Sequence, residues 1–476
     1  MKSNFEFELV IGLETHIELS TKTKIFCGCT TAFGGEPNTH CCPICIGLPG
    51  TMPQLNEQVV RFGQMAGLAT NCEIAKTARM DRKNYVYPDL PKAYQISQQF
   101  EPICKNGYVV LSSGKKIGIE RIHIEEDAGK LIHERGQLFV DYNRGGVPLI
   151  EIVSKPDFSS ADEVVEYLEC LQLIMKYIQI SDCKMQEGSL RCDVNISIRE
   201  KGSNKLGTRT EIKNMNSFSN IVRAIEFEKN RQADLIRNGQ EVVQQTLRFD
   251  DATGETIVMR SKECANDYRY FPEPDLVDII TTDEQIEELK SKIPELAYEK
   301  VNRYINDFGL EAYDAKILVK YRRVANFFEE AVKGTRAFKA CANFIISLVF
   351  SKLQKEEQKE EFKIKVSSSE MNKILVLLET GKIKNNVAKQ TLIEMLETGK
   401  KVDEILSDDD LKGLSEEELL EICKEAVANN EKAVADYLNG KLKAAKSIVG
   451  FVMKQTKGKA DAQVAEKLIV NLIKKA

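Results

Sequence analysis

Residues 10–19, with the sequence VIGLETHIEL, alternate between apolar and polar side chains at every second position. This period of two predicts a half-buried β-strand, because successive side chains of a strand point to opposite faces. The polar face carries Glu14, His16 and Glu18. Carboxylate oxygens and an imidazole nitrogen together suit a divalent cation, although a solvated sheet face shows the same pattern. Evidence from other segments of the sequence is needed to distinguish a metal site from a solvated polar surface.

Length, charge and cysteine content indicate a multidomain protein of a reducing compartment. At 476 residues the chain exceeds what one hydrophobic core serves, so we expect two or three domains. No apolar run reaches the length of a membrane span, and the first residues lack a leader pattern. Thirteen cysteines without an export signal indicate free thiols in a cytoplasmic protein. The net charge of −5 excludes a uniformly basic nucleic-acid binder, so any RNA contact must be a local patch.

Four cysteines form two closely spaced pairs, Cys27 with Cys29 and Cys42 with Cys45. Spacings of this kind let two backbone turns each present two thiolates, which complete a closed tetrahedron around zinc. A closed site leaves no position for water, so the predicted zinc is structural. The alternative is a set of unrelated reduced cysteines, and the neighbouring residues His40 and Cys41 complicate the choice of ligands.

Two further predicted strands carry acids. In IGIERIHIEE, residues 117–126, alternation places His123 and Glu125 on one side and leaves Glu126 with the isoleucines, unless the strand bulges. In VPLIEIV, residues 147–153, Glu151 interrupts an apolar run. A buried carboxylate must be paired, protonated or bound to a metal, so Glu151 is either a metal ligand or half of an ion pair.

Cationic and aromatic side chains gather at residues 81–98, DRKNYVYPDLPKAYQISQ. Arg82 and Lys83 suit phosphate contacts, while the tyrosines suit stacking on a base or ribose. Aromatic anchoring of a surface loop explains the segment equally well. Two later predicted strands, at residues 190–196 and 208–214, add more polar side chains that share a face.

These strands and the intervening helices predict an α+β fold with a largely antiparallel sheet. Ser160 and Glu163 form a capping box that begins a helix to about residue 178. Past residue 292 helical periods dominate, and two helices end alike in LETGK, where glycine suits a left-handed cap. From residue 441 onward nine lysines oppose two acids, which suits contacts with an RNA backbone but is also common in solubilising helices.

Ten segments together resemble one family, the B subunit of the bacterial tRNA-dependent aspartyl/glutamyl amidotransferase. They are VIGLETHIEL, CPICIGLPG, DRKNYVYPDLPKAYQISQ, RIHIEEDAGK, NRGGVPLIEIVSKPD, EGSLRCDVNIS, GTRTEIKNMNSF, DYRYFPEPDL, NNVAKQTLIEMLETGK and IVGFVMKQTKGKA. The resemblance spans essentially the whole chain. It implies a glutamine-synthetase-like antiparallel-sheet cradle domain over residues 1–294 with the zinc knuckle at 27–45, an all-α helical domain over 295–405, and a small all-α tRNA-binding tail domain over 406–476.

The resemblance also implies the reaction. ATP phosphorylates the side-chain carboxylate of misacylated Glu-tRNA(Gln) or Asp-tRNA(Asn), and ammonia from a partner amidase, the A subunit, then forms the amide. A small C subunit completes a heterotrimer. By this resemblance, the ligands of the family's magnesium site correspond to Glu14, His16, Glu126 and Glu151. The resemblance favours Glu126 over Glu125, although simple strand alternation would favour Glu125.

Further roles are predicted from the residues themselves. Phosphate contacts are assigned to Arg82, Lys83, Arg191 and Lys213, with Glu211 as a further metal ligand. The resemblance assigns tRNA binding to the tail, here to Lys441, Lys443, Lys457 and Lys459. The chain has no G-x-x-x-x-G-K-[ST] sequence, so its nucleotide site is not a P-loop. The rival interpretations are a non-catalytic zinc-bearing tRNA scaffold, and a ligase that acts on free glutamate without tRNA.

Overall fold

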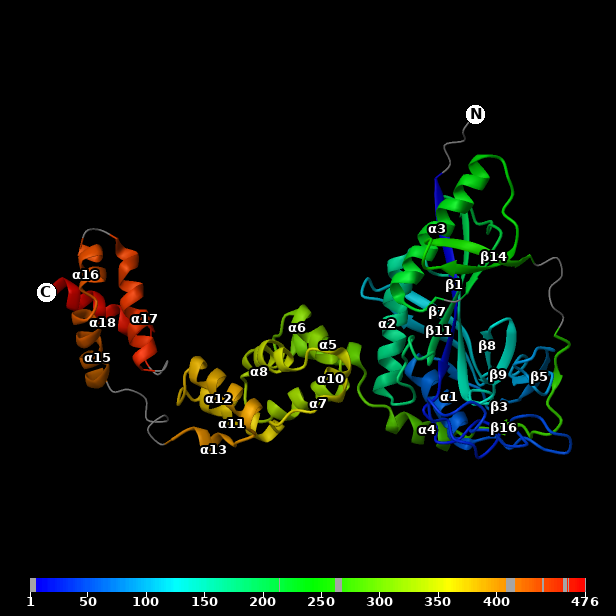
Figure 1. The fold of residues 1–476 in the computed structure, drawn as a ribbon, viewed down its shortest axis with the longest axis horizontal. Helices are drawn as coiled ribbons and strands as arrows, with labels where there is room; N and C mark the ends of the chain where they lie inside the picture. The colour runs from blue at the N-terminus through cyan, green and yellow to red at the C-terminus, as the bar shows by residue number, and fades with distance from the viewer. Residues whose placement is uncertain are drawn as a thin grey trace. The chain divides into compact units, whose positions relative to one another are not determined.

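The computed structural model describes residues 6–213, 215–261, 268–407, 416–438, 441–456, 460 and 462–475. The chain divides into two compact units, Met1–Leu296 and Ala297–Ala476, which are described separately (Figure 1). The three predicted domains, with boundaries at 294 and 405, stay a prediction. None of the helices in the described ranges combines the length and the apolar character that crossing a bilayer requires.

The first unit is built on a nine-stranded sheet. Its spatial order is β14 (Glu255–Ser261), β13 (Gln245–Asp250), β12 (Thr210–Lys213), β11 (Leu190–Glu200), β1 (Phe7–Glu18), β10 (Pro148–Ser154), β7 (Lys116–Glu126), β6 (Cys104–Val110) and β2 (Glu73–Ile74). The β12–β13 pair is parallel and the other neighbouring pairs are antiparallel. This mixed sheet with its helices agrees with the predicted α+β class, whereas the relation to glutamine synthetase stays a prediction.

The strand predicted from the alternating N-terminal segment is β1, in the middle of the sheet. Its apolar side chains are buried, including Ile11, Leu13 and Ile17. Three helices pack against the sheet: α1 (Glu57–Ala69), α2 (Ala161–Tyr177) and α3 (Phe218–Arg237) (Figure 1). Alternation then directs Glu14, His16 and Glu18 to the opposite, open face.

Local sequence signals explain where the elements begin. The predicted helix is α2, and the Ser160 hydroxyl caps it by accepting a hydrogen bond from the Glu163 N–H at 3.2 Å. The Glu163 carboxylate accepts from the Ser159 N–H at 2.7 Å, one residue earlier than a standard capping box. Helix α1 packs closely against β6 at Gly67. A Cβ at this position would lie only 2.3 Å from the Cys104 Sγ, so glycine allows the close approach.

Smaller elements complete the first unit. They are the sheet β15 (Phe271–Pro272), β4 (Asp81–Asn84) and β5 (Tyr94–Ser97), the pair β16 (Ile279–Ile280) and β3 (Thr77–Ala78), the hairpin β8 (Lys130–Glu134) and β9 (Gln137–Asp141), and helix α4 (Asp283–Lys292). Strand β15 pairs with β4 antiparallel, so it joins two segments far apart in the sequence.

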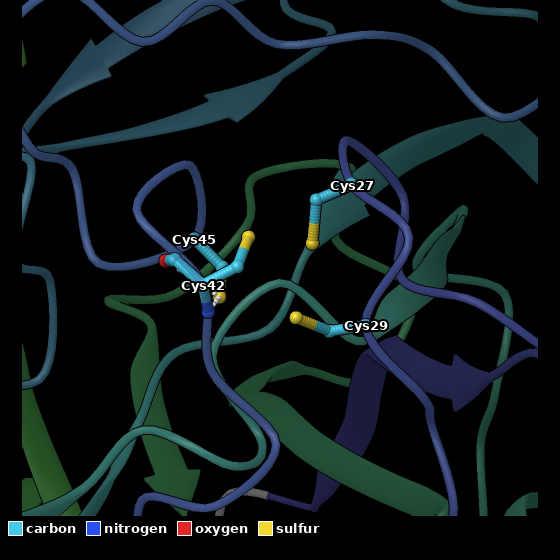
Figure 2. Close-up of side chains that lie close together, drawn as sticks. All are labelled: Cys27, Cys29, Cys42 and Cys45. Carbon is cyan, nitrogen blue, oxygen red and sulfur yellow. Dashed lines mark hydrogen bonds between the residues drawn. The ribbon is translucent and has the colours of Figure 1, made fainter.

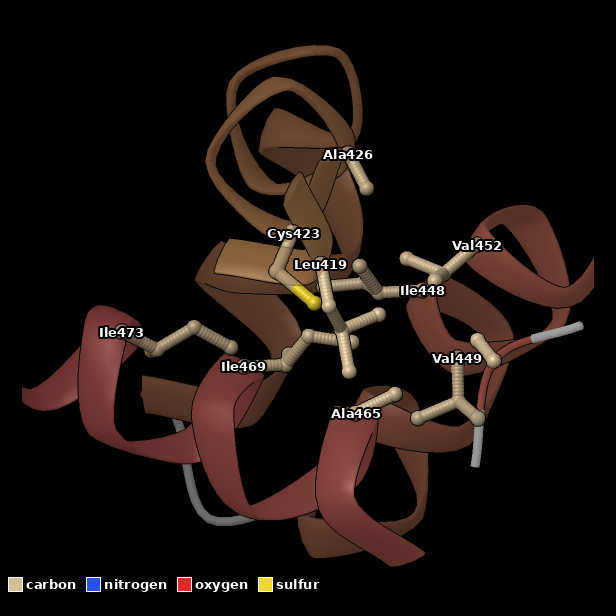
Figure 3. Close-up of a cluster of buried hydrophobic side chains, with 10 residues drawn as sticks. Leu419, Cys423, Ala426, Ile448, Val449, Val452, Ala465, Ile469 and Ile473 are labelled. Carbon is tan, nitrogen blue, oxygen red and sulfur yellow. The ribbon is translucent and has the colours of Figure 1, made fainter. Parts of the chain in front are cut away.

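The second unit contains helices and no strands among its described residues. Its helices include α5 (Ala297–Asn306), α6 (Ala312–Val319), α7 (Arg322–Ala331), α8 (Phe338–Phe344), α10 (Glu356–Glu361), α11 (Ser368–Glu379), α12 (Asn385–Thr398), α13 (Val402–Ile405), α15 (Glu416–Ala428), α16 (Glu431–Leu438), α17 (Ala445–Gln455) and α18 (Ala462–Lys475). Gly381 and Gly399 follow α11 and α12 with φ of +71° and +80°, as the two LETGK sequences predict. Buried side chains of α15, α17 and α18, among them Leu419, Ile448 and Ile469, form a core (Figure 3).

Candidate active site

Strands β1, β10 and β7 bring one histidine and two carboxylates together on the open face of the sheet. His16 pairs in register with Glu151, which pairs in turn with His123. The His16 Nε2 lies 3.4 Å from the Glu151 Oε2 and 3.6 Å from the Glu125 Oε1. One ligand atom from each of these three residues lies within 4.8 Å of the others. Two carboxylates and an imidazole within that span can hold a divalent cation.

Charge balance in this first cluster depends on the histidines. The His123 Nε2 lies 3.3 Å from the Glu151 Oε2 and 3.7 Å from the Glu125 Oε2. Burial alone would lower the pKa of His123, but the two carboxylates outweigh it and raise the pKa to about 9. Burial would likewise raise the pKa of Glu151, but both histidines hold it well below its usual range. Glu151, and Glu125 whose pKa His123 also lowers, are therefore ionised, and a bound cation would take the place of the protons on the histidines.

A second acidic cluster lies beside the first and consists of Glu14, Asp193 and Glu211, whose ligand atoms also lie within 4.8 Å of one another. The Asn195 Nδ2 donates to the Glu14 Oε1 at 2.9 Å, and the Thr246 Oγ1 donates to the Glu211 Oε2 at 2.9 Å. Burial and then the charge of Glu151 raise the pKa of Glu14, so the two clusters are electrostatically coupled. Crowded carboxylates repel one another unless a cation lies between them.

Lys213 supplies part of that positive charge. Its Nζ pairs with Asp193 and lies 3.0 Å from the Glu211 Oε1. Burial would lower the pKa of Lys213, but these carboxylates raise it. The buried Oδ1 of Asn195 has no hydrogen-bond partner within the described part of the chain, so it can accept from a further donor or contact a cation.

The structure does not bring Glu126 to either cluster, and Glu125 takes its place. Glu126 instead pairs with Lys92, and its Oε1 accepts a hydrogen bond from the Ile96 N–H at 2.9 Å. The physical reason is strand alternation: Glu125 and Glu126 pair in unbroken register with Leu149 and Pro148, so they point to opposite faces. The arrangement therefore favours Glu125 over Glu126 as the acid of the first cluster.

Two of the predicted phosphate contacts, Lys83 and Arg191, lie at the first cluster. Both line a cavity of about 220 Å³ together with His16 and Glu125. The Lys83 Nζ makes neither a hydrogen bond nor an ion pair within the described residues, and lies 5.0 Å from the centroid of the Tyr268 ring. Burial would lower the pKa of Lys83, but the charge of Glu125 raises it. Lys83 is therefore a cation available to an anionic ligand.

Arg191 is partly committed to other carboxylates. Its Nη2 donates to the Asp127 Oδ2 at 2.6 Å and lies 3.9 Å from the Glu18 Oε1. Burial and the neighbouring Asp127 raise the pKa of Glu18 to about 8, so near neutral pH Glu18 is mostly protonated. Asp127 is therefore the main counter-charge of the guanidinium, and Arg191 still lines this cavity.

Arg82 does not line the cavity at the first cluster. Its guanidinium makes a bidentate ion pair with the buried Glu273, at 2.7 and 2.9 Å, and lies 4.3 Å from the centroid of the Tyr94 ring. It lines a separate cavity of about 260 Å³ together with Lys92 and Glu126. This guanidinium ties β4 to the segment after β15, and its predicted contact with phosphate stays a prediction.

The four cysteines of the predicted zinc knuckle converge, with their Sγ atoms within 4.8 Å of one another (Figure 2). A hydrogen bond from Cys27, together with the Cys42 N–H at 3.1 Å and the Lys24 ammonium at 3.7 Å, lowers the pKa of the Cys45 thiol to about 4. Burial raises the pKa of Cys29 to about 11. The protein's own groups thus stabilise one thiolate, and four thiolates require a further cation such as zinc.

Comparison with known proteins places the whole chain in one family. The family model for the GatB/GatE catalytic domain matches residues 9–287, and a second, the GatB domain, matches residues 326–473. A protein of Caldicellulosiruptor saccharolyticus, named as the B subunit of aspartyl/glutamyl-tRNA(Asn/Gln) amidotransferase, is 53% identical over 473 residues. A protein of the same name in Clostridium tetani is 50% identical to this chain over 469 residues. Both alignments cover 98% of this chain and 98% of the relative.

The chain belongs to the B-subunit family of the aspartyl/glutamyl-tRNA(Asn/Gln) amidotransferases. Both acidic clusters and all four clustered cysteines lie within the match to the GatB/GatE catalytic domain. The resemblance drawn from ten sequence segments is thereby confirmed.

The structure also reveals site residues that the assignment from sequence left out. They are His123, Glu125, Asp193 and Asn195. The sequence contained a signal for them, because alternation groups His123 with Glu125, and Asp193 with Asn195, on single strand faces.

In the tail, Lys441 and Lys443 are exposed, and the Lys441 Nζ lies 3.0 Å from the Asp436 Oδ1. Lys457 and Lys459 lie outside the described residues.

Proposed function

We propose that this chain uses ATP to activate the side-chain carboxylate of Glu-tRNA(Gln) or Asp-tRNA(Asn), and that ammonia then converts the activated group to an amide. The observation that carries this proposal is the pair of coupled acidic clusters on the open sheet face, with Lys83, Arg191 and Lys213 beside them. Phosphoryl transfer depends mainly on positioning and on neutralising charge. A surface rich in both acids and bases, part of which lines one cavity, is suited to that task.

The chemistry balances without further reactants. An oxygen of the substrate carboxylate attacks the γ-phosphorus of ATP, and ADP leaves. Ammonia then attacks the acyl carbon, and inorganic phosphate leaves with one of the original carboxylate oxygens. Lys83 and Arg191 line the cavity and are placed to attract the substrate carboxylate and to neutralise charge on the phosphoryl oxygens.

The acidic clusters are the residues that would hold magnesium. His16, Glu125 and Glu151 supply one donor set, and Glu14, Asp193 and Glu211 supply a second. Magnesium, when bound, supplies positive charge against the phosphate oxygens. The oxygen-rich composition of both sets fits a hard divalent cation, which replaces the predicted single site that included Glu126.

Partner proteins follow from the same proposal. The relatives are each named as one subunit of an amidotransferase, and the sequence has no recognisable amidase signature. Ammonia therefore comes from an amidase A subunit, with a small C subunit completing a cytoplasmic heterotrimer that binds tRNA.

Release of labelled phosphate from ATP tests the reaction: it should require both charged tRNA and magnesium. Release without tRNA would favour a free-standing ligase, and absence of release would favour a scaffold.

For the cysteine cluster we propose a structural zinc ion held by Cys27, Cys29, Cys42 and Cys45. The purified protein should contain about one equivalent of zinc, because four thiolates form a closed site. The double variant Cys42→Ser/Cys45→Ser should lose the metal, as measured by elemental analysis. The control Cys41→Ser changes a neighbouring thiol that contacts Asn143 and Cys45 but is not one of the four clustered cysteines, and it should keep the metal. Zinc retained by the double variant would contradict the assignment.

The exposed lysines of the tail carry the proposed contact with the tRNA backbone. Replacing Lys443 with glutamine should weaken binding to every tRNA alike and should lower the salt dependence of log K by about 0.7–0.9 per lost phosphate contact. Binding measured over a series of salt concentrations checks this. The control Lys424→Gln removes an exposed lysine that is paired with Glu421 in the same unit. An unchanged slope for Lys443→Gln would show that this lysine is only solubilising.

A further inference from the structure

A row of five aromatic rings adjoins the cavity that His16 and Glu125 line, since two of its rings line that cavity themselves. In spatial order the rings are Phe100, Tyr270, Tyr268, Tyr85 and Tyr87. Neighbouring centroids are 6.4, 6.0, 6.1 and 5.7 Å apart along the row. The two rings nearest the middle, Tyr268 and Tyr85, themselves line the cavity. The row and the acidic cluster are therefore parts of one continuous surface.

Backbone hydrogen bonds fix this row in place. The Asn84 N–H donates to the Tyr268 carbonyl at 3.0 Å, and the Asn84 Nδ2 donates to the Arg269 carbonyl at 2.8 Å. The Tyr85 N–H donates to the Ala93 carbonyl at 3.1 Å. Two segments that are distant in sequence are thus joined at the point where their tyrosines meet, so the rings form a preorganised surface.

The outer rings of the row are left open to solvent. Tyr87 is 47% exposed and Phe100 is 54% exposed, and the neighbouring Val86 is 81% exposed. Aromatic anchoring of a loop would bury these side chains, because burial of the ring supplies the stabilisation. An exposed aromatic surface beside a charged cavity indicates a ligand with flat apolar faces. Lys83, under Tyr268, adds the positive charge that a phosphate-bearing ligand needs.

We infer that this aromatic row binds the unpaired 3′-terminal nucleotides of the charged tRNA and guides the aminoacyl end into the cavity. The inference rests on the proposed function. The amino acid is esterified to the terminal ribose, so its side-chain carboxylate enters the cavity only if the last nucleotides lie against the mouth. Single strands of RNA are held in this way, by bases stacked on aromatic rings and phosphates near cations.

The extent of the row favours a strand over a mononucleotide. One adenine covers one ring, whereas here exposed rings lie at both ends of the row and two more line the cavity between them. Stacking also needs no particular base, which suits a 3′ end shared by different tRNAs. The adenine of ATP is the other flat ligand in the reaction, and the experiment separates the two.

The test uses the assembled enzyme with its partner subunits and the variants Tyr87→Ala, Phe100→Ala and their combination. Each single variant should raise the KM for charged tRNA about tenfold, because loss of one stacking contact reduces affinity by that order. Tyr87→Phe and Phe100→Tyr keep a ring and should restore the wild-type KM. Phe33→Ala removes an aromatic side chain that is 78% exposed but outside the row, and serves as the matched control.

A second arm uses tRNA that lacks its unpaired 3′ nucleotides. Wild type and alanine variants should bind this truncated tRNA equally, because the bases that stack are missing. A rise in the KM for ATP instead of tRNA would overturn the inference and assign the row to adenine. Unchanged KM values for both substrates would also overturn it. Failure of the proposed function is distinct, because the wild-type enzyme would then release no tRNA-dependent phosphate.

Discussion

Replacing Glu151 with glutamine should lower the rate of tRNA-dependent phosphate release from ATP by about a hundredfold to a thousandfold. Glutamine keeps the size of the side chain but removes a negative charge that contacts His16 and His123 at 3.4 and 3.3 Å. Loss of one group that stabilises transition-state charge in a water-poor site has an effect of this size. Release of labelled phosphate in the presence of Glu-tRNA and magnesium measures it directly.

The neighbouring strand provides a comparison for this variant. Glu125→Gln should cause a loss of similar size, since Glu125 contributes to the same cluster. Glu120→Gln alters a glutamate on the same strand, β7, whose side chain is 59% exposed, and should leave the rate within about twofold of wild type. If Glu151→Gln and Glu125→Gln both retained the wild-type rate, the chain would be a tRNA scaffold whose carboxylates only form ion pairs.

Replacing Glu228 with alanine should lower the free energy of unfolding by about 3–5 kcal/mol, because it removes the acceptor at the centre of a buried network. Glu228 is fully buried on α3. Its carboxylate accepts from the hydroxyls of Thr210 and Thr256 at 2.9 and 3.0 Å, and from Gln232 at 2.9 Å and Arg231 at 2.6 Å. Alanine would remove the acceptor that these four donors share. Denaturant unfolding of this chain measures the loss.

The same helix supplies the control. Glu226 likewise pairs with a cation three residues later, Lys229, at 2.9 Å, but the two side chains are 46% and 41% exposed. Glu226→Ala should therefore change the free energy of unfolding by less than about 0.5 kcal/mol. Equal effects of the two variants would contradict the structural role of Glu228. Because Thr210 begins the strand that carries Glu211 and Lys213, loss of Glu228 should also disturb the second acidic cluster.

Alternation in the sequence predicted the open face of the sheet well. It placed Glu14 and His16 together on β1 and grouped His123 with Glu125 on β7, and the structure agrees because no bulge interrupts that part of β7. The preference for Glu126 came from resemblance, which identifies a segment more reliably than it identifies one of two adjacent acids. In a strand, a shift of one residue reverses the face.

Other features depend on contacts that no local pattern contains. Arg82 looked suited to phosphate, but its partner Glu273 lies 191 residues away and only the pairing of β15 with β4 brings them together. The separation of the acids into two clusters likewise depends on which strands flank β1. The same holds for the aromatic row, since Tyr85 and Tyr268 meet only through the folded backbone. Local periodicity determines which face a side chain occupies, whereas strand order determines its neighbours.

The central claim is that the substrate carboxylate itself attacks ATP on this sheet face. The most direct measurement uses Glu-tRNA whose side-chain carboxylate carries heavy oxygen, with the assembled enzyme, ATP, magnesium and ammonia. The inorganic phosphate released should carry one heavy oxygen, transferred from the carboxylate when the amide forms. Phosphate that contains only ordinary oxygen while amide is produced would show that ATP is hydrolysed by water, and would contradict activation of the carboxylate at this site.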